Sequence, residues 1–171
     1  MKRTDNVGRI SRRLVGLSGA IVFVAAAIAW TDDITQRTMI AKWAGSYDTD
    51  AFLRLPDVHS ELQSLLGQEF SHLMKNLDVR GAVDLSGQTL SVTGNAPHRG
   101  AEEEGIVCVT VLPTDTYVEA AIFSNGAVTV YTSAEKYEYA SICIKDWITL
   151  VNSGHADRFQ QPANVRVVKP Q

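Results

Sequence analysis

Cysteine is scarce in this sequence, and the common motifs of enzymes are missing. Only two of the 171 residues are cysteines, Cys108 and Cys143, and neither lies in a C-x-x-C pair or in a zinc-like spacing. The four histidines stand at positions 59, 72, 98 and 155, without an H-E-x-x-H, a G-x-S-x-G or a phosphate-cradling loop. We therefore expect no metal, no cofactor and no enzymatic activity.

Basic residues are also scarce once the N-terminal segment is set aside. Residues 1–29 hold five basic residues and one acidic residue, which leaves 11 basic and 18 acidic residues elsewhere, a net charge of −7. Such an acidic domain is unsuited to nucleic acid, whose phosphates require Lys and Arg. It suits a basic protein partner, because opposite net charge speeds association.

The chain has no internal repeat and no low-complexity tract. Apolar residues make up 45% of it and charged residues 20%, which is the composition of a globular protein. Its length predicts one domain with at most a short appendage. The oligomeric state does not follow from the sequence.

One long uncharged run is present near the N terminus. It extends over 16 residues, from Leu14 to Ala29, and follows the five basic side chains. A positive flank stays in the cytoplasm and directs the rest outward. Residues 1–29 are therefore predicted to be a cleaved signal peptide, which the A-x-A pattern at Ala27–Ala29 favours, or a signal-anchor. The domain is accordingly expected in the periplasm, free or anchored in the inner membrane.

The role of the two cysteines stays open at this point. An oxidising compartment permits a disulfide, but spacing alone does not show that Cys108 and Cys143 meet. They serve either as one covalent staple or as two small buried residues.

Residues 30–50 are mixed and polar, and are expected to form a linker that gains structure near Met39–Trp43. The domain is predicted to cover residues 51–152. Its first pattern runs from Pro56 to Leu77, where apolar residues recur in steps of three and four and predict a helix with one buried face. Gly67 can break this helix in two. His59 and His72 fall on its polar side and are expected to be solvated.

Short β-branched runs follow, separated by turn residues. They predict strands at residues 82–85, 90–93, 106–112, 117–123 and 127–132, the last two joined by Asn125-Gly126, a strong hairpin signal. A helical pattern over 137–151 and a loose polar tail over 153–171 complete the chain. The predicted fold is α+β: an antiparallel meander of about five strands, packed by helices before and after it.

The connection from Gly94 to Gly105 is unusual. Its twelve residues exceed the two to five that are usual in hairpins, and Pro97 stiffens it. We expect a protruding finger that holds His98 and Arg99 at its tip. Glu102–Glu104 are interpreted as a solvated charge run at its base. The alternative is a surface turn whose side chains touch only water.

Several segments are similar to a known family. Ala96-Pro97-His98-Arg99, with Leu90–Gly94 before it and acidic residues after it, resembles the inhibitor of vertebrate lysozyme (Ivy) family, whose exposed loop has the form C-x-P-H-x-C. The family's leading helical region resembles residues 52–77, its later hairpin resembles 118–131, and its closing segment resembles the region of Tyr139 and Trp147.

The resemblance implies a protein partner, a cationic lysozyme, and an inhibitory loop that enters its cleft. The loop would consist of Asn95, Ala96, Pro97, His98, Arg99 and Gly100, with His98 meeting the catalytic carboxyl groups. Asn95 and Gly100 stand where the family has cysteines, so the loop lacks the disulfide that would fix its shape.

The sequence leaves three classes of function open. The first is an exported inhibitor or binding module, which requires an exposed His98. The second is a structural envelope module, anchored by residues 1–29 and engaging another envelope protein without inhibition. The third is an enzyme in which His98 and Glu102–Glu104 form an acid/base site, and peptidoglycan hydrolysis would reveal it.

Overall fold

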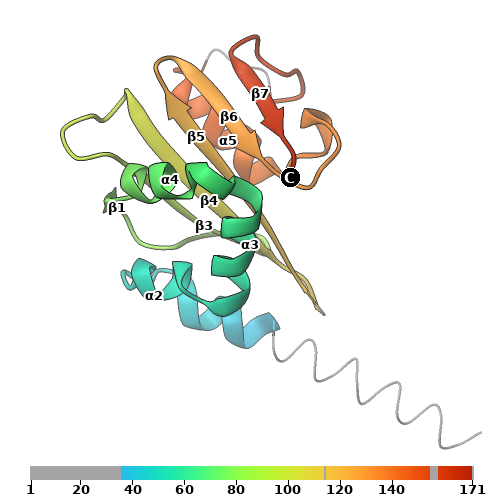
Figure 1. The fold of residues 1–171 in the computed structure, drawn as a ribbon. Helices are drawn as coiled ribbons and strands as arrows, with labels where there is room; N and C mark the ends of the chain where they lie inside the picture. The colour runs from blue at the N-terminus through green and yellow to red at the C-terminus, as the bar shows by residue number, and fades with distance from the viewer. Residues whose placement is uncertain (1–35, 114, 155–157, 171) are drawn as a thin grey trace, which may run out of the picture.

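The computed structural model describes residues 36–113, 115–154 and 158–170. The helices are α2 (Thr49–Leu53), α3 (Pro56–Leu66), α4 (Phe70–Asn76) and α5 (Ile142–Val151), with short 3-10 helices η1 (Gly67–Glu69) and η2 (Tyr137–Tyr139). The strands are β1 (Val79–Arg80), β2 (Asp84–Ser86), β3 (Thr89–Asn95), β4 (Glu103–Val111), β5 (Thr116–Ser124), β6 (Ala127–Tyr131) and β7 (Val165–Val168). Helices precede and follow the main run of strands, so the predicted α+β class is confirmed (Figure 1).

The long helical pattern folds as the sequence predicts, including its break. Helix α3 begins at Pro56, since proline is tolerated in the first turn where its missing N–H is not needed. Gly67 follows α3 with a φ of +52°, a left-handed conformation that favours glycine. The chain then continues through η1 into α4, and the apolar face of both helices is buried.

The sheet is larger than the predicted meander. Its seven strands run in the order β1-β3-β4-β5-β6-β7, and β2 also pairs with β3. All neighbours are antiparallel except β6 and β7, which are parallel. The five predicted runs correspond to β2 through β6. The expected hairpin at Asn125-Gly126 joins β5 to β6 with φ angles of +52° and +79°.

Strands β1 and β7 were not predicted from the sequence, and each absence has a physical reason. Strand β1 has only two residues and follows directly after α4. Strand β7 lies in the segment expected to be a loose tail, and it pairs with a strand more than thirty residues earlier, Val128 opposite Val165. Periodicity within a short window gives no sign of such a distant pairing.

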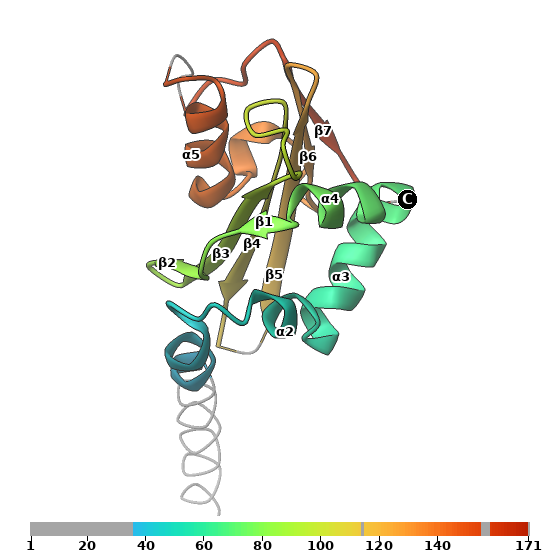
Figure 2. The ribbon, with the colours of Figure 1, turned by 90° about the vertical axis from the view of Figure 1, so that its left-hand side faces the viewer.

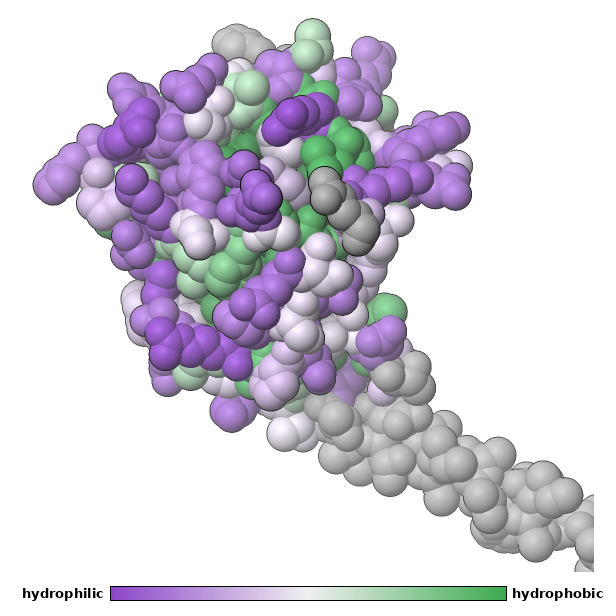
Figure 3. Space-filling model, in the orientation of Figure 1, coloured by the Kyte–Doolittle hydropathy of each residue, from purple (hydrophilic) through white to green (hydrophobic). Residues whose placement is uncertain are grey.

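Helices cover both faces of the sheet, as the edge-on view shows (Figure 2). Side chains alternate along a strand, so Val107 and Val109 of β4 pack toward α2, α3 and α4, while Ile106 and Cys108 pack toward α5. The second helical segment was expected to pack on the same sheet or close an edge. It packs on the face opposite α3 and α4, whose own outward surface is largely hydrophilic (Figure 3).

The structure settles the open question of the cysteines. Cys108 and Cys143 form a disulfide with a Cα–Cα distance of 6.3 Å. Because Cys108 lies on β4 and Cys143 on α5, the bond attaches this helix covalently to the centre of the sheet.

Removing this disulfide is expected to destabilise the fold strongly. The two cysteines are 35 residues apart. Closing a loop of that length lowers the entropy of the unfolded chain, which raises the free energy of the unfolded state by about 3–4 kcal/mol at 25 °C. The double variant Cys108→Ala/Cys143→Ala should show this loss in chemical denaturation. Reducing agent should destabilise the wild type to a similar degree and leave the variant unchanged; equal stability of both proteins without reductant would contradict the prediction.

The segments flanking the predicted domain contribute to it where the structure describes them. Residues 36–43 are helical, and Trp43 is buried with its ring 5.6 Å from that of Phe52. The segment expected as a linker therefore packs into the core from residue 36 onward. The predicted signal peptide or anchor, residues 1–29, lies outside the described residues. Among the described helices, none is long and apolar enough to cross a membrane.

Candidate functional site

The connection between β3 and β4 is shorter than the sequence suggests. Strand β3 extends to Asn95 and β4 begins at Glu103, so the connecting loop consists of residues 96–102. Gly94 and Gly105 do not belong to it; they are paired opposite each other in the sheet. A Cβ atom at Gly105 would lie 2.9 Å from Leu73 Cδ1, and one at Gly94 would lie 2.7 Å from the Val79 carbonyl oxygen. These glycines allow close packing rather than sharp reversals.

The tip of the loop is a tight turn. Arg99 N donates to the Ala96 carbonyl oxygen at 3.0 Å, which leaves Pro97 and His98 as the two central residues. Proline at the first of these positions and a positive φ at the second, +60° for His98, are features of a type II turn. Ala96 is buried beneath the turn, whereas Pro97, His98 and Arg99 are exposed. The turn therefore presents the imidazole to the surroundings.

Hydrogen bonds within the loop close it at its base. Ala96 N donates to the Glu103 carbonyl oxygen at 2.9 Å, and Glu103 N donates to the Arg99 carbonyl oxygen at 3.0 Å. Ala101, with a φ of +67°, donates its N–H to Glu104 Oε1 at 3.0 Å. The loop thus has a defined shape that its own backbone and side chains maintain.

Asn95 and Gly100 lie next to each other. Asn95 Nδ2 donates to the Ala96 carbonyl oxygen at 2.9 Å, and a Cβ atom at Gly100 would lie 3.7 Å from the same nitrogen. These are the two positions at which the C-x-P-H-x-C loop has its cysteines. The geometry for closing the loop at these positions is retained: the Asn95 amide bonds the loop backbone, and a Cβ at Gly100 would be in van der Waals contact with the Asn95 side chain.

Glu103 makes the most contacts at the base of the loop, contrary to the expected solvated charge run. It is 6% exposed, and Ser124 Oγ and Asn76 Nδ2 donate to its carboxylate at 2.7 and 3.2 Å. His72 Nε2 lies 2.9 Å from Glu103 Oε2, and Arg99 Nη2 lies 3.6 Å from Oε1. We refer to Glu103 with His72, Asn76, Ser124 and Arg99 as the Glu103 cluster. Glu102 is exposed, as expected.

The two helix histidines are not simply solvated. His72 Nδ1 lies 3.1 Å from Glu69 Oε2, so each of its ring nitrogens faces a carboxylate. Burial, the largest single influence, lowers the pKa of His72, but the hydrogen bonds to Glu103 and Glu69 and their negative charges together raise it above 6.5. His59 packs edge-on against the Phe70 ring, with centroids 5.2 Å apart. The polar side of the helix was identified correctly, but its tertiary neighbours were not.

The pKa of Glu103 moves in the opposite direction. Burial is again the largest single influence and raises the pKa of Glu103. The hydrogen bonds from His72, Ser124 and Asn76 and the His72 charge together outweigh burial, so the net pKa lies below 4.5. Glu103 is therefore an ionised carboxylate at neutral pH, held between helix α4 and the loop.

A comparison with protein families decides the classification. The model of the family described as "Inhibitor of vertebrate lysozyme (Ivy)" matches residues 57–151. The chain belongs to the Ivy family. The match extends from the start of α3 to the end of α5 and includes the loop, the Glu103 cluster and both disulfide cysteines. Neither the curated proteins nor the solved structures gave a match.

The sequence pointed to the loop as the candidate site, but it gave no indication of the Glu103 cluster. One signal was present: alternation along β4 places Glu103 on the same side as Gly105 and Val107, the side that faces α4. Arg99 comes from the loop itself, but His72 and Asn76 come from α4 and Ser124 from the end of β5, and no sequence spacing links these three to residue 103. The described residues contain no cluster of three or more His, Cys, Asp or Glu suited to a metal ion.

The loop positions allow a direct test of the missing family disulfide. The double variant Asn95→Cys/Gly100→Cys is expected to form a disulfide without reductant, since the two side chains face each other across a short distance. If the protein inhibits a lysozyme, the preformed loop should bind about three- to tenfold more tightly, because less ordering remains to be done on association. A thiol assay and mass spectrometry report the bond; the Asn95→Ser/Gly100→Ser variant is the control. Two free thiols under oxidising conditions would contradict the geometry.

Proposed function

We propose that this protein is an exported lysozyme inhibitor that inserts residues 95–100 into the active-site cleft of its target. The observation that supports it most is the position of His98, exposed at the second central position of a turn that the loop's own hydrogen bonds maintain. Membership of the Ivy family supports the class of function. We assign the protein no catalytic activity of its own.

The mechanism follows from the chemistry of an imidazole in a cleft of carboxyl groups. Lysozymes use one carboxylic acid to protonate the leaving group and a second carboxylate opposite it. A hydrogen bond from a His98 ring nitrogen would occupy either group, and the turn would exclude the sugar chain from the cleft. Among the described residues, none hydrogen-bonds the His98 ring, so both nitrogens are free to engage the target.

The charge of the domain supports a cationic target. Beyond residue 29 the net charge is −7, and Glu102 lies exposed beside His98 and Arg99. Opposite charge accelerates encounter and suppresses association with acidic proteins. The proposed contact should therefore weaken in salt, since ion screening shortens the range of these interactions.

Export has two lines of support. The basic flank and hydrophobic run of residues 1–29 have the form of a signal peptide or a signal-anchor. The disulfide between Cys108 and Cys143 is of a kind that persists in oxidising compartments.

Gln36 hydrogen-bonds the Val111 carbonyl oxygen at the far end of β4 from the loop. The chain thus enters the domain away from the loop (Figures 1 and 2), so an uncleaved anchor would leave the loop accessible.

A second candidate is a membrane-anchored envelope module without inhibitory activity. The observation in its favour is the pair Asn95 and Gly100, which leaves the loop without the covalent closure of the family motif. The amide hydrogen bond that replaces it contributes only about 1 kcal/mol. Retention of residues 1–29 in the mature protein, measured by mass spectrometry, would favour this candidate.

The test is an inhibition titration. The purified protein is added to a vertebrate lysozyme, and to a lysozyme of another class, during digestion of bacterial cell walls at low and moderate salt. Inhibition that saturates at one equivalent supports the proposal. A folded protein that inhibits neither enzyme would leave the envelope module as the better assignment, and cell-wall hydrolysis by the protein alone would indicate an enzyme.

A further inference from the structure

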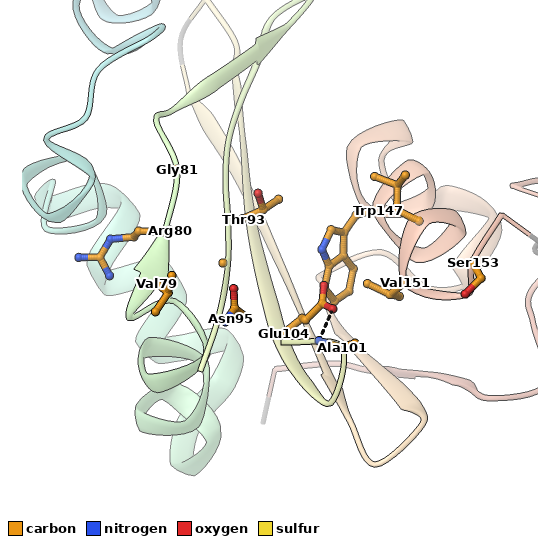
Figure 4. A pocket seen from close by; sticks show the side chains of 12 residues that line it. Val79, Arg80, Gly81, Thr93, Asn95, Ala101, Glu104, Trp147, Val151 and Ser153 are labelled. Carbon is orange, nitrogen blue, oxygen red and sulfur yellow. Dashed lines mark hydrogen bonds between the residues drawn. The ribbon is translucent and has the colours of Figure 1, made fainter. Parts of the chain in front are cut away.

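A groove lies beside the loop on the face of the sheet that carries α5. One cavity of about 680 Å³ is lined by Val79, Thr93, Asn95, Glu104, Trp147 and Leu150, among others (Figure 4). A second cavity of about 520 Å³ shares Thr93, Trp147 and Leu150 with the first and extends to Asp84 and Ile142. Because the two cavities share lining residues, they adjoin each other, and we call them together the α5 groove.

The groove exists because α5 covers only part of this face. Its buried side chains and the disulfide hold it over β4 and β5. The neighbouring strand β3 presents Thr89, Ser91 and Thr93 to the same side, and its alternate residues Leu90 and Val92 are buried on the other. The floor is therefore hydroxyl-lined, and α5 forms one wall.

Apolar side chains are exposed along this groove. Leu150 is 75% exposed, and Val79 and Ile142 are each 51% exposed. Single exposed apolar residues are ordinary, but several gathered in one hollow mark a surface that binds a partner. The opposite flank of the loop is different: it is formed by the charged Glu103 cluster and by α4.

The loop alone is too small to form a stable interface with a lysozyme, so the lysozyme must also contact the surface beside it. Stable protein interfaces involve about 20–30 residues on each side, and a loop of residues 96–102 supplies far fewer. A lysozyme that receives the loop must therefore contact neighbouring surface. The groove is continuous with the loop, since Asn95, Ala101 and Glu104 line it. The strongest contacts in interfaces are those that become fully desolvated. The exposed Leu150, Ile142 and Val79 along the groove can be desolvated by a partner in this way, whereas the other flank presents the charged Glu103 cluster.

The charges in the groove suit the same partner. Glu104, Asp84 and Asp146 line it. The one basic side chain among the lining residues of the two cavities is Arg80, and its guanidinium bonds Asp50 and Thr49 outside the hollow (Figure 4). Asp146 pairs with Arg158, whereas the Glu104 carboxylate, among the described residues, accepts only the backbone N–H of Ala101. A basic protein meets complementary charge here.

We infer that the α5 groove is the second half of the lysozyme contact and receives an apolar protrusion flanked by basic side chains. This inference rests on the proposed function. The loop would block the cleft, and the groove would supply affinity and determine which lysozymes fit.

Leu150→Lys tests the inference. Leu150 is exposed near the C-terminal end of α5, where a positive charge suits the helix dipole, so the fold should be unaffected. The added charge and the lost apolar contact should raise the dissociation constant for a vertebrate lysozyme at least about tenfold. Leu112→Lys, the same substitution at an exposed leucine beyond the far end of β4, should change it less than twofold.

The outcomes separate the two proposals. Wild-type binding that Leu150→Lys leaves unchanged, but that depends on His98, overturns the groove inference and leaves the inhibitor assignment intact. A change in oligomeric state without a change in lysozyme affinity assigns the groove to a second copy of the chain and also overturns the inference. A wild-type protein that binds no lysozyme overturns both.

Discussion

Replacing His98 by glycine is expected to weaken lysozyme inhibition at least about 30-fold while leaving the free energy of unfolding within about 0.5 kcal/mol of wild type. The backbone at this position has a φ of +60°, which glycine adopts without steric cost, so the turn should be retained. The imidazole is exposed, and its removal leaves no cavity. Central groups of an interface contribute 2 kcal/mol or more, which corresponds to the expected factor.

A second variant separates the side chain from the flexibility of the backbone. Asparagine tolerates a positive φ better than most residues do, so His98→Asn keeps the loop restricted while removing the ring. The expected result is again a large loss of inhibition. If only the glycine variant lost activity, loop flexibility rather than the imidazole would be responsible.

Asn125 offers a matched control for both variants. It occupies the neighbouring turn between β5 and β6, has a φ of +52° and is exposed. Asn125→Gly should retain inhibition and stability. Inhibition constants from cell-wall digestion and unfolding curves for the three variants complete the measurement. Full inhibition by His98→Gly would show that the loop histidine does not block the cleft.

The parts of the fold that depend on neighbouring residues were accessible from the sequence. The helix that begins at Pro56, its break at Gly67 and the turn at Asn125-Gly126 all follow from local periodicity and from backbone preferences. The candidate loop was proposed from a short motif. Each of these features is encoded within a few consecutive residues, and burial only reinforces what the local pattern already favours.

The features that were missed depend on long-range contacts. Strand β7 pairs in parallel with β6 across more than thirty residues. Glu103 looks like its neighbours in a charged run, and only the position of α4 shows that it is buried. Sequence patterns report which face of an element is apolar, but they do not report which polar groups of other elements will meet a buried charge.

Glu103→Ala is expected to destabilise the protein by about 3 kcal/mol and to weaken inhibition as well. The substitution removes the acceptor of Ser124 and Asn76 and the partner of His72, and buried groups left unpaired are costly. It also releases Arg99 from the base of the loop. Glu102→Ala, the adjacent exposed carboxylate, should change stability by less than about 0.5 kcal/mol. Equal stability of the two variants would show that the Glu103 cluster does not support the fold.

The same cluster should make stability depend on pH through His72. Both ring nitrogens face carboxylates, and only the protonated imidazole can donate from both. Because the pKa of His72 is raised in the folded state, its stabilising contribution is complete below about pH 6.5 and is lost as the pH rises through the folded value. The pKa of Glu103 is lowered, so its contribution is complete above about pH 4.5 and is lost as the pH falls through the folded value.

The stability difference between wild type and His72→Gln should therefore be largest between about pH 4.5 and 6.5 and should decrease toward pH 8.5. Denaturation of both proteins across this range measures the difference, and an NMR titration of the His72 ring gives its pKa directly. His59→Gln is a useful control, because His59 contacts a phenylalanine ring rather than a carboxylate. A His72 pKa below 6.5, or a stability difference that grows with pH, would mean that the imidazole is neutral in the cluster and donates to at most one of the two carboxylates.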